Sequence, residues 1–179
     1  SGVLHVLYYV VLLRGYRKAD LTVVYPLARG TGPLLSALVA VTLLGERLSA
    51  TAALGIAGVV GGVFLIAGGP ALLRTAHDAQ ARRRVRKGMQ YGVLTGVFIA
   101  SYTVVDGYAV KAMLLSPILV DYMGNFVRVL VLAPVALRDR VELRRLWAAQ
   151  WRFALLVAVV SPVAYVLVLY AMQSAPLSH

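Results

Sequence analysis

The chain contains no cysteine, and only 14% of its 179 residues are charged. Without cysteine there are no disulfides and no thiol chemistry. A soluble domain has about 25% charged and about 45–50% apolar residues, whereas this chain is 60% hydrophobic. The short alternating strands of a membrane barrel are not visible either. The remaining class is an all-α membrane protein, because helices satisfy their own backbone hydrogen bonds in lipid.

Six apolar segments alternate with short polar stretches. Because most of them approach the roughly 20 residues needed to cross a bilayer, we expect about six transmembrane helices. The chain begins inside an apolar run and ends where another run starts, so we expect both ends to lie within a longer protein. The predicted spans are residues 3–15, 21–44, 51–69, 88–110, 117–137 and 153–172.

Lysine and arginine gather in every second loop. Residues 14–20, 74–87 and 138–152 hold three, six and five of them, whereas the opposite loops hold only Arg47 and Lys111. The positive-inside rule then places the basic loops on the cytoplasmic side of the cell inner membrane. A short basic run between two spans sets topology far more often than it binds nucleic acid, so we expect no nucleic-acid partner.

The third basic loop, RDRVELRRLWAAQWR (residues 138–152), has Trp147 and Trp151 one turn apart. This pattern is typical of a short helix that lies along the headgroup region, where tryptophan is enriched. A plain polar connector between two spans is the alternative.

An internal repeat relates the first and sixth segments. Residues 9–22 align with residues 165–178 at five identical positions out of fourteen, among them the pair Tyr9 and Tyr165. The offset spans five predicted helices, an odd number, so two such repeats would have opposite orientations in the membrane. Inverted repeats are typical of secondary transporters, whose binding site lies near the membrane midplane. We therefore expect the chain to be the central part of a ten-helix, 5+5 inverted-repeat transporter.

The segments ADLTVVYPLARGTGPLLSALVAVTLLGERLS and LGIAGVVGGVFLIAGG, in this order, resemble the EamA-like branch of the drug/metabolite transporter superfamily. The shared features are a mid-helix proline, a run ending in LGE and a glycine-rich helix. The resemblance implies two inverted five-helix repeats around a central cavity, without a cofactor. Residues 1–70 would then belong to the first repeat, 71–87 to the linker and 88–179 to the second repeat. In this family the linker usually lies outside, whereas here it is the most basic loop.

Arg29 is the strongest candidate for a site residue, since a charge within a span is costly and usually faces a cavity or an ionic partner. Pro26 and Pro33 each remove a backbone donor nearby, and Gly30 and Gly32 weaken the helix between them. We expect a kinked or locally unwound helix, with the guanidinium beside free backbone groups. Such a site suits a carboxylate or phosphate of a substrate. The alternative is a structural arginine paired with a carboxylate.

Polar residues on the later spans complete the predicted site. Asp106 would pair with Arg29 or Arg128, or carry a proton, as carboxylates within spans do. Asn125 and Arg128 would form one polar stripe with Tyr122, because neighbours three residues apart share a helix face. The predicted substrate-binding residues are Tyr25, Arg29, Tyr102, Asp106, Asn125, Arg128 and Tyr165.

Small residues recur every fourth position on two predicted spans. Such smooth faces let helices approach closely in lipid, so we expect both to be packing faces. They are formed by Gly88, Gly92, Gly96 and Ala100 on one span and by Gly58 and Gly62 on another.

The function that these patterns favour is a secondary transporter, moving a small polar or anionic metabolite by alternating access. Its partners would be that metabolite and membrane lipids, and a homodimer is left open. His5 has no second histidine at a metal-ligand spacing, so we expect no metal. Two alternatives remain, a non-transporting membrane subunit and a lipid-modifying membrane enzyme. The enzyme is disfavoured because no HExxH motif, H-x-x-x-x-D motif or cysteine is present.

Overall fold

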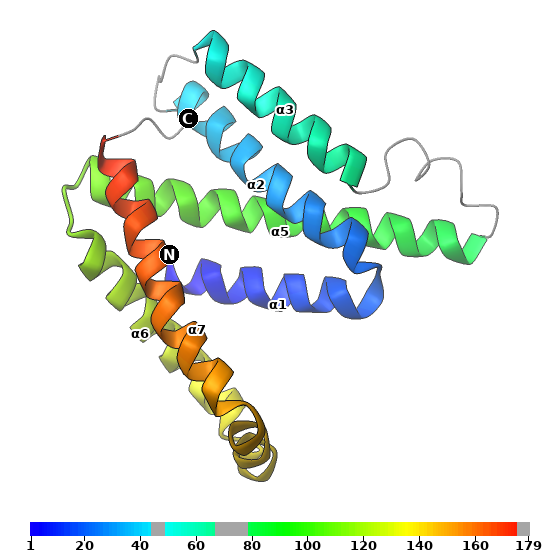
Figure 1. Ribbon diagram of the computed structural model, residues 1–179, viewed down its shortest axis with the longest axis vertical. Coiled ribbons are helices and arrows are strands. Elements are labelled where there is room, and N and C mark those ends of the chain that lie inside the picture. Colours follow the sequence, from blue (N-terminus) through cyan, green and yellow to red (C-terminus); the bar gives the residue numbers. More distant parts are fainter. Residues whose placement is uncertain (44–48, 67–78, 175–179) are drawn as a thin grey trace. The chain divides into compact units, whose positions relative to one another are not determined.

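The computed structural model describes residues 1–43, 49–66 and 79–174, in which all regular structure is α-helical and no strand occurs. Each of the six predicted spans is helical over nearly all of its described residues (Figure 1). The LGER motif at 44–47, the linker residues 71–78 and the end of the repeat match at 175–178 lie outside the described residues. The helices are α1 (Gly2–Lys18), α2 (Leu21–Leu43), α3 (Ala50–Ile66), α5 (Ala79–Lys111), α6 (Pro117–Ala136) and α7 (Arg140–Ser174).

Three of the described helices are long and apolar enough to cross a membrane. They comprise Arg82–Lys111, Pro117–Ala136 and Arg140–Gln173, and α3 is a shorter apolar helix of 17 residues. A hydrocarbon core about 30 Å thick requires roughly 20 apolar residues at 1.5 Å per residue. The chain therefore has the make-up of a helical membrane protein.

Two helices extend well beyond their predicted spans. Helix α5 begins at Ala79 rather than at residue 88, and α7 begins at Arg140 rather than at residue 153. Alanine, arginine and glutamine are good helix formers, and neither basic stretch contains proline or glycine to interrupt the helix. At the start of α7 the Glu142 backbone N–H donates to Asp139 Oδ1 at 2.9 Å, which caps the helix. Residues 140–152 are thus helical as predicted, but they begin the 35-residue helix α7 rather than form a short separate one, and their position at the membrane interface stays a prediction.

The chain divides into two compact units. One comprises Leu7–Val104, and the other combines Ser1–Val6 with Val105 and the described residues that follow it. Each unit is described by itself below. The repeat boundaries expected near residues 70 and 88 stay a prediction.

The first unit is held together by close packing of α2 on α5. A Cβ atom placed on Gly92 would lie 2.8 Å from Leu27 Cβ and 3.2 Å from the Val24 carbonyl oxygen. Those distances leave no room for a side chain, so the small-residue face of α5 is confirmed as a packing face. The buried core of this unit consists of Tyr8, Leu12, Val24, Ala28 and Ile99.

Helix α3 packs on α2 by a different face from the one expected. Its contact runs through Val63, whose side chain lies within 2.9 Å of a Cβ placed on Gly30 of α2. By contrast, no atom lies within 4 Å of a Cβ placed on Gly58 or Gly62. Within the described ranges, the prediction that these two glycines pack against a helix is therefore wrong. The face of α3 that carries Val63 contacts α2, and the two glycines lie on a different face.

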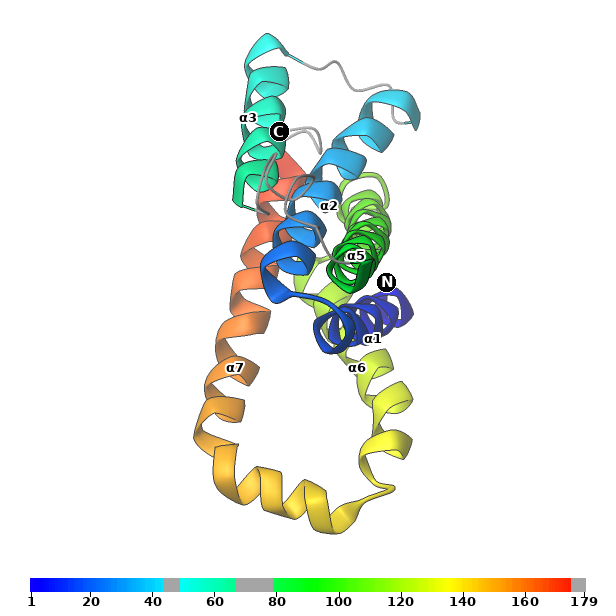
Figure 2. The ribbon, with the colours of Figure 1, turned by 90° about the vertical axis from the view of Figure 1, so that its right-hand side faces the viewer.

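The second unit is built from α6, α7, the end of α5 and the first turn of α1. Helices α6 and α7 contact each other. Helix α7 bends sharply near its start (Figure 2). The first turn of α1 packs on α6, where a Cβ on Gly2 would lie 2.8 Å from the Gly124 carbonyl oxygen. This close approach brings His5 into the unit.

Candidate functional site

Arg29 lies on α2 one turn after Tyr25 and stacks on it. The guanidinium carbon is 5.5 Å from the centroid of the Tyr25 ring, and the two side chains also form a hydrogen bond. Both side chains are exposed in the structure. A cation over an aromatic face is attracted by the ring quadrupole, which holds the flexible arginine in one orientation.

Two further tyrosines lie near the guanidinium. Tyr8 of α1 and Tyr102 of α5 contact each other edge to face, with ring centroids 6.0 Å apart. Both are close enough to interact electrostatically with Arg29. Tyr8 is 7% exposed and belongs to the core, so this part of the site is rigidly supported.

The helix around Arg29 is continuous, so the expected local unwinding is wrong, whereas the alternative of a kink stays a prediction. Helix α2 runs without interruption through Pro26 and Pro33. A proline removes only one donor and one i to i−4 bond, and a helix that packs on both sides tolerates that loss. The hydroxyls of Thr31 and Ser36 donate back to carbonyls one turn earlier, at 2.6 and 3.0 Å. The site is therefore a side-chain site on a continuous helix.

The described residues bring no carboxylate into ion-pair contact with Arg29; its partners are tyrosines. A guanidinium presents five N–H donors in a planar fork, and one ring and one hydroxyl use few of them. The remaining donors suit an anionic oxygen pair such as a carboxylate or a phosphate. The arrangement can thus bind an anion without displacing an ion pair among the described residues.

A second polar cluster lies in the other unit, and Asp106 of α5 is at its centre. The Tyr165 hydroxyl of α7 donates to Asp106 Oδ2 at 2.5 Å, a bond between residues 59 positions apart. Asp106 is 2% exposed. His5 of α1 stacks edge to face on Tyr165, with ring centroids 5.6 Å apart. Three helices therefore meet at this hydroxyl and carboxylate.

Helix α6 contributes an ion pair that the sequence reading missed. Asp121 Oδ1 lies 3.6 Å from an Arg128 nitrogen, and the Asn125 amide donates to Asp121 Oδ2 at 2.9 Å. Asp121 is 2% exposed, whereas Tyr122 is 66% exposed. The polar stripe is thus Asp121, Asn125 and Arg128, and the expectation that Tyr122 belongs to it is wrong. Arg128 pairs with Asp121, and the expected pairing with Asp106 is not seen.

The spacing of Asp121 from Asn125 and Arg128 was a usable signal. Residues at i, i+4 and i+7 share one helix face, so the carboxylate fits the stripe better than a tyrosine at i+1. His5 carried a similar signal, as an isolated polar residue in an apolar segment. It is 6% exposed, and its ring nitrogen Nδ1 lies 3.3 Å from the Ser1 carbonyl oxygen.

The cluster contains two buried carboxylates. Asp106 and Asp121 are both buried, and Arg128 is the cation that contacts one of them. Within the described ranges, no group of three or more His, Cys, Asp or Glu residues is placed to hold a metal ion. The contacts described in the cluster are hydrogen bonds and one ion pair.

The predicted site residues thus fall into two groups. Arg29, Tyr25 and Tyr102 gather in the first unit, while Asp106, Asn125, Arg128 and Tyr165 gather in the second. Comparison with protein families, with curated proteins and with solved structures gives no match.

Proposed function

We propose that the protein is a multi-pass secondary transporter of the inner membrane that moves a small anionic metabolite by alternating access. The observation that supports this most is Arg29, an arginine on an apolar helix whose described partners are tyrosines and not carboxylates. In a membrane such a charge is costly unless an ion or a water-filled path compensates it. A transported carboxylate or phosphate would supply that compensation. The EamA-like fold and the ten-helix inverted repeat belong to the same proposal.

The two clusters would then have different roles. Arg29 with Tyr25 and Tyr102 would bind the anionic group of the substrate. Asp106 with Tyr165 would carry the proton that couples transport to the proton gradient, since this carboxylate is buried and hydrogen-bonded by a hydroxyl. The Asp121–Arg128 pair fits a structural role, because its charges already compensate each other.

The test is uptake by the full-length protein in proteoliposomes. A panel of radiolabelled carboxylates and phosphates is compared with uncharged analogues of similar size. We expect uptake of one anionic class, reduced at least about tenfold in Arg29→Gln, because a charge-assisted hydrogen bond contributes about 1.5–3 kcal/mol. Arg29→Lys should retain part of the uptake, since it keeps the charge but loses the planar fork.

Arg83→Gln is the matched control, because it removes the same charge from an exposed position in the basic start of α5. Equal loss in both variants would show that uptake depends on net charge and not on a site at Arg29. A well-folded wild-type protein that takes up no anion of the panel would reject the transporter in favour of a non-transporting membrane subunit.

A further inference from the structure

The start of α7 is an exposed basic surface, which we define as residues 138–152. Every residue in it is exposed, and it contains five arginines but only two acidic residues. Both acidic side chains already have a partner within the surface. Asp139 accepts the Glu142 backbone N–H as the helix cap, and the Glu142 carboxylate lies 3.6 Å from Arg145. Arginines of this surface therefore retain free donors and uncompensated charge.

One face of this helical segment combines arginine and tryptophan. Arg140, Arg144, Trp147 and Trp151 are spaced at i, i+4, i+7 and i+11, which places them along a single stripe. Trp147 is 56% exposed and Trp151 44% exposed. Neither Arg140 nor Arg144 has an ion-pair partner in the described part of the chain. The stripe thus offers cations and indole rings to the same external partner.

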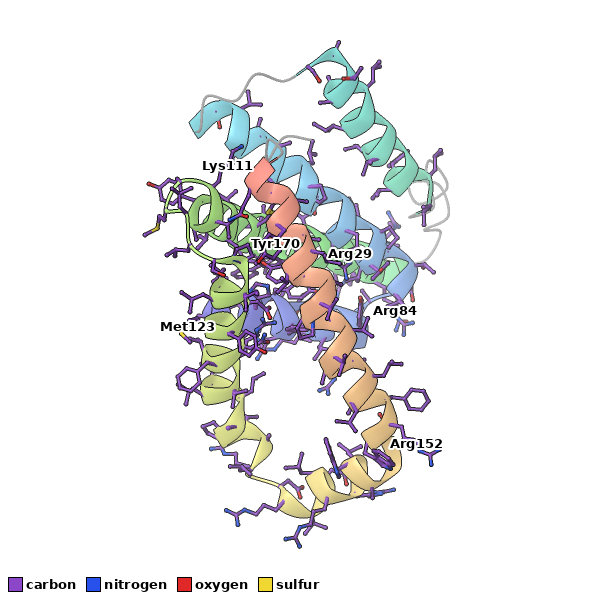
Figure 3. The ribbon with its side chains drawn as sticks, turned by 60° about the vertical axis from the view of Figure 1, so that its left-hand side comes forward. Arg29, Arg84, Lys111, Met123, Arg152 and Tyr170 are labelled. Carbon is purple, nitrogen blue, oxygen red and sulfur yellow. The ribbon has the colours of Figure 1, made fainter. Side chains whose placement is uncertain are left out.

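The geometry of α7 fits a partner that lies in a plane. The helix bends sharply after this segment (Figure 2), so its start points in a different direction from the apolar part that follows. Near the bend the Arg152 side chain extends away from the helix (Figure 3), with its guanidinium carbon 5.5 Å from the Trp151 ring centroid. If the apolar part of α7 crosses the bilayer, the basic start runs along the bilayer surface.

We propose that this surface binds the phosphates of anionic phospholipid headgroups, with Trp147 and Trp151 at the boundary between headgroups and acyl chains. Arginine forks match phosphate oxygens in a bidentate manner, and indole rings favour this boundary. The charge is complementary to the anionic leaflet that faces the cytoplasm. Each arginine near such a surface strengthens binding about fivefold. This inference is independent of the transport activity.

Tryptophan fluorescence tests the proposal directly, because Trp147 and Trp151 are the two tryptophans of the chain. The full-length protein, with any tryptophan outside these 179 residues replaced by phenylalanine, is reconstituted in vesicles of phosphatidylcholine with a minor fraction of brominated lipid, either phosphatidylglycerol or phosphatidylcholine. We expect brominated phosphatidylglycerol to quench several-fold more strongly at equal mole fraction. Bromine placed near the headgroup should also quench more than bromine deep in the chain.

Substitutions identify the groups responsible. Arg140→Gln with Arg144→Gln should reduce the preference for phosphatidylglycerol at least threefold, while Arg140→Lys with Arg144→Lys should largely keep it. Arg83→Gln with Arg84→Gln removes the same charge from exposed positions of α5 and should leave the preference unchanged. Equal quenching by both brominated lipids in the wild type would overturn the proposal. An equal loss of the preference for phosphatidylglycerol in the Arg83→Gln, Arg84→Gln control and in the Arg140→Gln, Arg144→Gln variant would overturn it as well.

Discussion

At the residue scale, the Asp121–Arg128 ion pair is an interaction that a single substitution should disrupt. The Asp121 side chain is 3% exposed and the Arg128 side chain 20% exposed, so each charge depends on the other for compensation. Asp121→Asn should lower the free energy of unfolding by about 3 kcal/mol, because it leaves a largely buried guanidinium without a carboxylate. Unfolding in detergent micelles, followed by circular dichroism, measures the change.

A double-mutant cycle separates the pair from other effects of the substitution. The double variant Asp121→Asn with Arg128→Met should lose less free energy of unfolding than the two single variants lose together. The difference, which is the coupling energy, should be about 1–3 kcal/mol. Additive losses would show that the two side chains do not stabilise each other. The cycle also decides whether Arg128 belongs to the structural frame, as proposed, or to the substrate site.

The same residues show how far a sequence can predict a site. Arg29 and Asp106 stand out because charge within an apolar run is rare, and Tyr165 was found through the repeat. The sequence could not show that the Tyr165 hydroxyl reaches Asp106, because the two lie 59 residues apart on different helices. The partner of a buried charge depends on tertiary packing, which apolar patterns leave undetermined.

At the element scale, the helices were predictable and their contacts only partly so. Apolar length located all six, and the small-residue face of α5 was identified correctly. The expected unwinding of α2 was wrong because the loss of single hydrogen bonds at Pro26 and Pro33 does not outweigh packing against two neighbouring helices. The face at Gly58 and Gly62 was misjudged because a glycine pattern alone does not say which side of a helix has a neighbour.

Gly92 and Gly58 provide a matched test of these two faces in this chain. Gly92→Ala should reduce stability by about 1–3 kcal/mol, since its Cβ would lie 2.8 Å from Leu27 Cβ and backbone would have to move. Gly58→Ala should be neutral or stabilise by up to about 1 kcal/mol, because its surroundings are open and alanine favours a helix. Thermal unfolding of both variants in the same detergent checks the prediction. Equal changes in melting temperature would contradict the difference in packing.

At the scale of the whole molecule, the distribution of basic residues predicts how the chain crosses the membrane. Helix α6 separates the turn at Met113, which carries no excess of basic residues, from the basic surface at residues 138–152. If α6 spans the bilayer, these two regions lie on opposite sides, with the basic one in the cytoplasm. The EamA resemblance favours the reverse orientation, so the two arguments make different predictions that one measurement can separate.

These 179 residues contain no native cysteine, so none of them gives background labelling, and any cysteine elsewhere in the protein is replaced by serine. Met113→Cys and Ala148→Cys place single thiols at exposed positions on the two sides of α6. With a membrane-impermeant maleimide on intact spheroplasts, we expect labelling of Met113→Cys at once and of Ala148→Cys only after permeabilisation. The reverse order would still agree with α6 as a span. It would contradict the orientation predicted by the positive-inside rule and support the one that the EamA resemblance favours. Labelling of both thiols from the same side would contradict the assignment of α6 as a span, and with it the odd number of helices on which the inverted repeat depends.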